Sequence, residues 1–184
     1  MVIFIPLQYQ KPKTGNHKLS ILKTLTIDGF YSTEEAIRLS NVVASLQFNP
    51  IQYDLGTEIE NFNLVPENCS ELFSSVLHRK VIVDDENSGS FRIPKMFIHF
   101  EDFYTAQDLI FVVAVEPSTF NIFEHKSGAE NAIQGRDFVY RNLFEWDLTV
   151  NYLLKPGQGV FFRPWLFHSF NNGIIQMFRL KEVD

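Results

Sequence analysis

The sequence is poor in cysteine and has no excess of basic residues. Cys69 is the only cysteine among 184 residues, which excludes an intrachain disulfide framework. The 16 lysines and arginines are outnumbered by 22 aspartates and glutamates, so the formal net charge is −6. A binder of duplex nucleic acid usually has a basic surface, and this balance therefore disfavours nucleic acid as a partner. No apolar run approaches the roughly 20 residues of a membrane-spanning helix, so no membrane partner is expected.

What the sequence does contain is typical of one folded domain rich in β-structure. Hydrophobic residues make up 45% and charged residues 21%, which excludes a disordered chain. The length matches a single domain over residues 1–184, because domains average about 150 residues. The 19 phenylalanines predict a mainly β protein with an aromatic core. Residues 1–6 lack a basic leader, so the expected location is the cytoplasm. The oligomeric state stays open.

Two helices are predicted before residue 80. Ser32 and Glu35 form a capping-box pattern, which marks a helix N-terminus. Apolar residues then recur at helical spacing at Ala36, Leu39, Val43 and Leu46. A second helix is predicted after Pro66, with an apolar face of Leu72, Phe73, Val76 and Leu77.

Short apolar runs separated by turn residues follow the helices. They lie at 81–83, 91–100, 109–115, 120–123, 138–143, 148–154, 159–162 and 174–180, and a further strand is predicted at 22–27. So many short strands predict a sandwich or jelly roll. Helices before strands indicate an α+β fold, mainly β, with the N-terminal helices packed on one face.

His99 and Glu101 form the first candidate site. Side chains alternate along a strand, so these two residues share a face of the predicted strand at 91–100. A histidine and a carboxylate on one face inside an aromatic barrel could hold a metal ion. A salt-bridged surface pair is the competing interpretation, and the spacing alone does not separate the two.

His168 and Arg179 lie on either side of a predicted hairpin turn. Asn172-Gly173 between two apolar runs is a strong signal for a two-residue loop. Such a loop would pair His168 with Met177, and Arg179 has the same parity as Met177. His168 and Arg179 would then face one side, with Cβ atoms roughly 7–8 Å apart. A three-residue loop would reverse that parity.

An arginine that faces inward from an apolar strand needs an anionic partner, because burial of an unpaired guanidinium is costly. The partner of Arg179 is either a structural carboxylate or a small dicarboxylate that the guanidinium holds in a bidentate contact.

Taken in order, His99-x-Glu101, His168 and Arg179 resemble the motif of the Fe(II)- and 2-oxoglutarate-dependent oxygenases. They are similar in particular to the prolyl-hydroxylase-like branch, which has H-x-D or less often H-x-E, a distal histidine and then an arginine or lysine. Residues 28–36 also look like the first helix of that branch, and 156–169 resemble the strand and turn before its distal histidine. The resemblance covers about residues 22–182.

The resemblance implies a double-stranded β-helix, or jelly roll, that acts as a 2-oxoglutarate-dependent dioxygenase. Fe(II) would be held by His99, Glu101 and His168, a ligand set typical of non-haem oxygenases. 2-Oxoglutarate would chelate the iron, with its far carboxylate on Arg179, and O₂ would be the oxidant. The reaction would hydroxylate an unidentified small-molecule or peptidyl substrate.

The sequence also departs from the pattern of this family. Glu101 replaces the commoner aspartate, and Asp102 is a second candidate for the carboxylate ligand. The tyrosine and glycine that often precede the proximal histidine are absent from 91–95. Two alternatives are a jelly-roll binding or structural protein without catalysis and a cupin-like metalloenzyme that does not use 2-oxoglutarate. Arg179 distinguishes the oxygenase from the cupin-like enzyme, which needs no such cation.

Exchange of each acidic residue tests which one is the ligand. Glu101→Gln removes the anionic oxygen but keeps the side-chain volume, so metal affinity should fall by at least about tenfold, the effect expected when a metal site is perturbed. Asp102→Asn should leave the affinity nearly unchanged, because strict alternation turns Asp102 away from His99. Calorimetric titration with Mn(II) measures both, and the reverse result would assign the ligand to Asp102.

Overall fold

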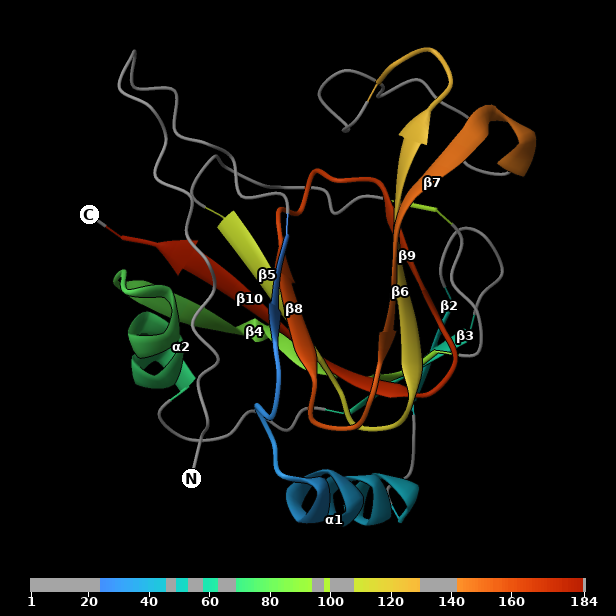
Figure 1. Cartoon of the computed structure of the whole chain (residues 1–184). Coiled ribbons are helices and arrows are strands. Elements are labelled where there is room, and N and C mark those ends of the chain that lie inside the picture. The colour runs from blue at the N-terminus through green and yellow to red at the C-terminus, as the bar shows by residue number, and fades with distance from the viewer. Residues whose placement is uncertain are drawn as a thin grey trace.

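Two antiparallel β-sheets face each other across a hydrophobic core (Figure 1). The structure is a computed structural model and describes residues 24–45, 49–52, 58–62, 69–93, 98–99, 108–129 and 142–183. The strands of the larger sheet are β1 (Thr24–Ile27), β2 (Asn49–Gln52), β3 (Glu58–Phe62), β4 (Val81–Arg92), β5 (Asp108–Ala114), β8 (Gly159–Phe162) and β10 (Ile174–Glu182). The strands of the smaller sheet are β6 (Ser118–His125), β7 (Trp146–Leu154) and β9 (His168–Asn171).

The strand order fits a jelly-roll-like sandwich. The larger sheet runs β1-β8-β5-β10-β4-β3-β2, and the smaller runs β7-β6-β9. The chain changes sheets between β5 and β6, and it then alternates between the two sheets from β7 through β8 and β9 to β10. The described residues form a mainly β fold with two α-helices, and no described helix is long and apolar enough to cross a membrane.

Each face of the larger sheet has its own hydrophobic cluster, because side chains alternate along its strands. The β5 residues in the inner cluster, between the two sheets, are Ile110, Val112 and Ala114. The β5 residues in the outer cluster, on the opposite face, are Leu109, Phe111 and Val113. Burial on both faces explains why β5 has an uninterrupted apolar sequence.

The first helix, α1 (Thr33–Ala44), begins at the predicted capping box. The Glu35 backbone N–H donates to Ser32 Oγ at 3.2 Å, and the Ser32 N–H donates to Glu35 Oε2 at 2.8 Å. The hydrogen bond from the Ser32 backbone N–H, and then one from the Ser32 side chain, lower the pKa of the Glu35 carboxyl. At the other end of α1, Val43 packs with Val115 and Ile174 at the end of the sandwich, below the sheets in Figure 1.

The second helix, α2 (Cys69–Leu77), packs elsewhere, on the outer face of the larger sheet (Figure 1). Phe73 is fully buried there. Its ring centroid lies 5.4 Å from Phe30, 5.0 Å from Phe111, 5.9 Å from Phe161 and 5.2 Å from Phe178. Leu72, predicted on the apolar face, is 43% exposed, so that part of the prediction is wrong. The expectation that both helices share one face is not confirmed.

The structure differs from the strand predictions in several places. The composition of residues 84–90 indicates a turn, but in the structure β4 continues through them. A register shift against β10 accommodates the extra residues within the strand. β2 and β3 lack a clear sequence signal, and Pro50 is tolerated because β2 is an edge strand. Leu143 begins a 3₁₀ helix (Leu143–Glu145) and does not end a strand. Residues 138–141 lie outside the described residues.

Phe73 and its sequence neighbour Leu72 provide a matched test of the outer cluster. Phe73→Ala should lower the free energy of unfolding by about 3–5 kcal/mol, because it leaves a cavity among four aromatic rings. Leu72→Ala removes an exposed side chain and should cost less than about 1 kcal/mol. Urea denaturation measures both, and equal losses would contradict this packing.

Candidate metal and dicarboxylate site

The candidate site is built around His99 and His168, which face each other across a single β-bridge. The His99 N–H donates to His168 O at 2.9 Å, and the His168 N–H donates to His99 O at 2.8 Å. Directly opposite residues in an antiparallel pair place their side chains on the same face. The two imidazole centroids accordingly lie 4.2 Å apart, with an interplanar angle of 52°.

One nitrogen of His168 is already engaged with the backbone. His168 Nδ1 lies 2.8 Å from Leu166 O, and a carbonyl oxygen can only accept, so Nδ1–H is the donor. In the neutral ring the lone pair is then on Nε2. The Nε2 atoms of His168 and of His99 are both buried. This tautomer is the one in which Nε2 can bind a metal ion.

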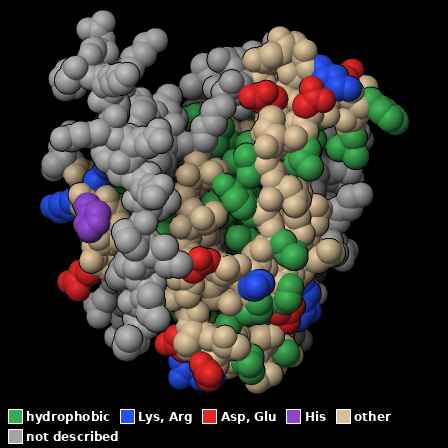
Figure 2. Space-filling model, in the orientation of Figure 1, with side chains coloured by type: hydrophobic (Ala, Val, Ile, Leu, Met, Phe, Trp, Pro, Cys, Tyr) green, Lys and Arg blue, Asp and Glu red, His purple; other side chains and the backbone are tan. Residues whose placement is uncertain are grey.

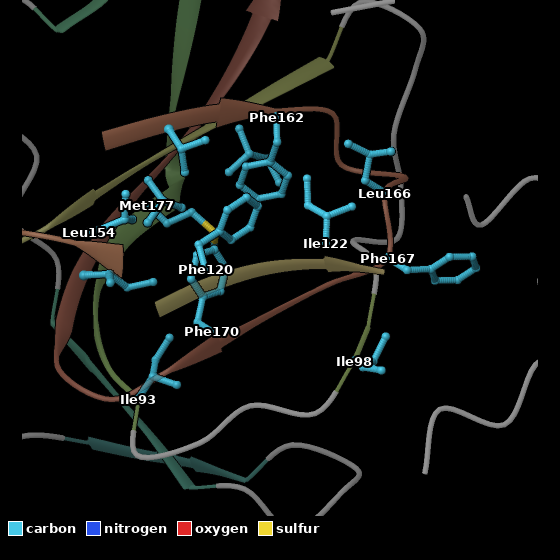
Figure 3. Packing of buried hydrophobic residues seen from close by; sticks show 14 of the residues in the cluster. Ile93, Ile98, Phe120, Ile122, Leu154, Phe162, Leu166, Phe167, Phe170 and Met177 are labelled. Carbon is cyan, nitrogen blue, oxygen red and sulfur yellow. The ribbon is translucent and has the colours of Figure 1, made fainter. Parts of the chain in front are cut away.

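Aromatic side chains from both sheets surround the His168 ring. Its centroid lies 4.7 Å from Phe162, 5.6 Å from Phe170 and 6.1 Å from Phe120. Figure 3 shows these three phenylalanines packed together between the sheets, with Ile122 beside them. A metal ion or anion held here would lie in a region of low dielectric constant, where electrostatic contacts are stronger than in water.

Arg179 faces the same interior from the larger sheet. It pairs with Ile110 of β5, and Ile110 pairs with Phe162 of β8, whose ring contacts His168. Ile110, Phe162 and Met177 all belong to the inner cluster, so Arg179, two residues beyond Met177, is on that face. Neighbouring strands are about 4.8 Å apart, which puts the backbone of Arg179 roughly 10 Å from that of Phe162.

The hairpin prediction is right about the turn and wrong about the pairing. Asn172 and Gly173 have φ values of 62° and 78°, the positive values of a type I′ turn. The strands on either side do not pair with each other, because β9 pairs with β6, and β10 pairs with β4 and β5. Other segments hold the turn: Ser118 Oγ donates to Asn172 O at 2.7 Å, and the Ile93 N–H donates to Gly173 O at 3.0 Å.

A hydrogen bond on the outer face of the larger sheet supports β10, the strand that carries Arg179. The Tyr31 hydroxyl donates to Gln176 Oε1 at 2.6 Å, on the side of β10 opposite Arg179. Burial, and then the nearby Cys69 and Glu35, raise the pKa of Tyr31, so the phenol stays a neutral donor at physiological pH. A partly buried tyrosine on the outer face has no sequence signal that marks it as a support of the site.

The predicted carboxylate ligand, Glu101, lies outside the described residues, as do Asp102 and half of the predicted strand at 91–100. β4 ends at Arg92, and His99 forms an isolated bridge. Within the described ranges, no group of three histidine, cysteine or acidic side chains is placed to hold a metal ion. The role of Glu101 therefore stays a prediction.

Comparison with known proteins supports the fold. No protein-family model matches the sequence, and no curated protein is significantly similar to it. HygX from Streptomyces hygroscopicus, solved with nickel, 2-oxoglutarate and hygromycin B bound, is 11% identical, with a TM-score of 0.55 over 86% of this chain and 81% of that one. SnoN, a non-heme alpha ketoglutarate dependent epimerase from nogalamycin biosynthesis, is 10% identical, with a TM-score of 0.59 over 86% and 76%. The chain thus shares its fold with these two proteins.

Two glycines with positive φ test how strongly the turn between β9 and β10 is held. A Cβ on Gly173 would lie 2.6 Å from Pro117 O, whereas one on Gly128, with φ of 89°, would meet nothing within 4 Å. Gly128→Ala should cost about 1–2 kcal/mol of stability for the left-handed backbone alone. Gly173→Ala should cost about 2–4 kcal/mol, because the clash adds to that strain. Thermal denaturation compares the two, and equal costs would contradict the tight packing of the turn.

Proposed function

We propose that this chain is a non-haem Fe(II)- and 2-oxoglutarate-dependent oxygenase built as one jelly-roll domain. The observation that carries the proposal is the pair His99 and His168, whose rings converge with both Nε2 atoms buried on the inner face. Arg179, on the inner face of the larger sheet, supplies a cation for the far carboxylate of 2-oxoglutarate. The fold shared with HygX and SnoN supports this choice, since HygX was solved with 2-oxoglutarate bound and SnoN depends on alpha ketoglutarate, which is the same compound.

The donor set fits an iron ion. Metal-binding histidines commonly donate their other ring N–H to a carbonyl or carboxylate, and His168 Nδ1–H does so to Leu166 O. We assign His99 and His168 as ligands, with Glu101 as the proposed carboxylate. Bound Fe(II) would supply the redox chemistry, which is the oxidative decarboxylation of 2-oxoglutarate by O₂ coupled to attack on a substrate C–H bond.

The protein's own residues bind and orient the reactants. The Arg179 guanidinium has the fork geometry that matches a carboxylate, so it would hold the far end of the diacid. Phe120, Phe162 and Phe170 surround the buried His168 ring, and this apolar setting keeps water away from it and strengthens charged contacts nearby. The hydrogen bond from Tyr31 to Gln176 holds β10, the strand that carries Arg179, from its outer face.

We infer that the substrate is a small molecule or a peptide and that the reaction is a hydroxylation. The net charge is −6, and acidic and basic side chains are interspersed on the face shown in Figure 2, an arrangement that suits a small uncharged or mixed-charge substrate better than a nucleic acid. SnoN is an epimerase, so a protein of this fold can also perform another reaction. Product analysis distinguishes hydroxylation from epimerisation.

Metal titration tests the two histidines. His99→Ala and His168→Ala should each abolish binding of Mn(II), a redox-quiet substitute for Fe(II), with the fold retained. His78→Asn is the control, because His78 is exposed after α2 with φ of 52°, a conformation that asparagine tolerates. The control should bind Mn(II) as the wild type does. Calorimetry that shows wild-type affinity in either alanine variant would contradict the assignment.

Binding of 2-oxoglutarate is tested in the absence of oxygen, with the wild type and two Arg179 variants. Addition of 2-oxoglutarate to the Fe(II)-loaded wild type should produce a visible charge-transfer band, and admission of air should release succinate slowly. Arg179→Ala should weaken 2-oxoglutarate binding by about tenfold to a hundredfold, and Arg179→Lys by less, while metal binding persists in both. If the wild type shows neither the band nor succinate, the chain is a jelly-roll binding protein and not an oxygenase.

A further inference from the structure

An acidic residue, Asp84 of β4, lies directly opposite Arg179 on the neighbouring strand of the larger sheet. β10 runs between β5 and β4, and Arg179 pairs with Ile110 on one side and with Asp84 on the other. Val81 and Val83 of β4 belong to the outer cluster, so Asp84, which alternates with them, is on the inner face with Arg179. Asp84 is exposed, so it lies where the inner face opens to solvent.

A bulge in β4 creates this juxtaposition. Met177 pairs with Gly89, so an unbroken ladder would bring Asn87 opposite Arg179. The register shift instead brings Asp84 there and leaves three extra residues in β4, since five positions of β4 match two of β10. The bulge thus replaces a neutral amide with a carboxylate beside the arginine.

Ser88 holds the bulge in this register. The Arg179 backbone N–H donates to Ser88 Oγ at 3.0 Å, and the Ser88 hydroxyl donates to Asp84 O at 2.6 Å. Ser88 is 5% exposed, so both hydrogen bonds are shielded from water. One side chain therefore links the backbones of the two charged residues and fixes them opposite each other.

The charge of Asp84 opposes the proposed role of Arg179. Residues directly opposite in an antiparallel pair have Cβ atoms roughly 4.5–5.5 Å apart, within reach of a guanidinium and a carboxylate. An aspartate at that position attracts the guanidinium and repels any second carboxylate that approaches it. The next pair on the same face, Lys181 with Asp108, is also a cation opposite an anion.

We propose that Asp84 determines the affinity and selectivity of the diacid site by competing with the far carboxylate of the cosubstrate for Arg179. The inference rests on the proposed function. With Asp84 ionised, binding of a diacid requires the guanidinium to exchange one carboxylate for another, so a diacid gains less from Arg179 than it would from an uncompensated arginine. A monoacid without the far carboxylate is unaffected.

Asp84→Asn tests this competition through binding and not turnover. The probes are 2-oxoglutarate and pyruvate, which share the 2-oxo acid group, while pyruvate lacks the far carboxylate. In the Mn(II)-loaded protein, Asp84→Asn should lower the dissociation constant of 2-oxoglutarate by about three- to tenfold, the size expected for removal of one nearby like charge. The dissociation constant of pyruvate should not change. The gain should shrink at high salt, because Asp84 is exposed.

Two control variants separate this effect from a general change in charge or in folding. Asp147→Asn removes an exposed carboxylate on β7 of the other sheet and should leave 2-oxoglutarate affinity unchanged. Asp84→Glu keeps the charge and should keep the wild-type affinity for 2-oxoglutarate. Equal affinity of wild type and Asp84→Asn, or an equal gain for pyruvate, would overturn the competition while the proposed function stands. If the Mn(II)-loaded wild type binds no 2-oxoglutarate, the proposed function falls and this inference with it.

Discussion

The register of β10 between β5 and β4 decides which side chains the larger sheet presents to the candidate site. Ile175 and Met177 face the inner cluster, and Phe178 and Leu180 face the outer one. A slip by one residue would exchange the two faces, moving Arg179 into the outer cluster and Phe178 towards the histidines. Because apolar side chains fill the outer cluster, such a slip would bury a guanidinium among them, which is costly.

Residues far from the site maintain this register. Phe178 packs against Phe73 of α2 at 5.2 Å, and Gln176 accepts the hydrogen bond from Tyr31, which precedes α1. α2 and the segment before α1 thus support the site from the face of β10 opposite Arg179. The position of Arg179 depends in this way on the aromatic packing of the outer cluster, although none of those rings faces the site.

The candidate site joins the two sheets. His168 is on β9 of the smaller sheet and bridges to His99, whereas Arg179 is on β10 of the larger sheet. The separation between the histidines and the cation is therefore set by the packing of one sheet against the other, through Phe162 of β8 and Phe120 and Phe170 of the smaller sheet. The turn at Asn172-Gly173 carries the chain from one sheet to the other, and its contacts with Ser118 and Ile93 keep the two strands apart.

The amino-acid sequence by itself determined the features that depend on neighbours in the chain. The capping box at Ser32 and Glu35, the buried β5 run and the left-handed turn at Asn172-Gly173 follow from local rules and are present as predicted. Arg179 lies on an inner face, as predicted, but it does not share a hairpin face with His168, because the two residues belong to different sheets.

Only the tertiary structure decided which strands are neighbours. Local periodicity shows which side of a strand is buried, but hydrogen bonds between strands are formed with segments far away in the sequence. The bridge of His99 to His168, the separation of β9 from β10 and the bulge that brings Asp84 opposite Arg179 are all of this kind. Each depends on how two sheets pack and how a strand absorbs extra residues, which no short stretch of sequence specifies.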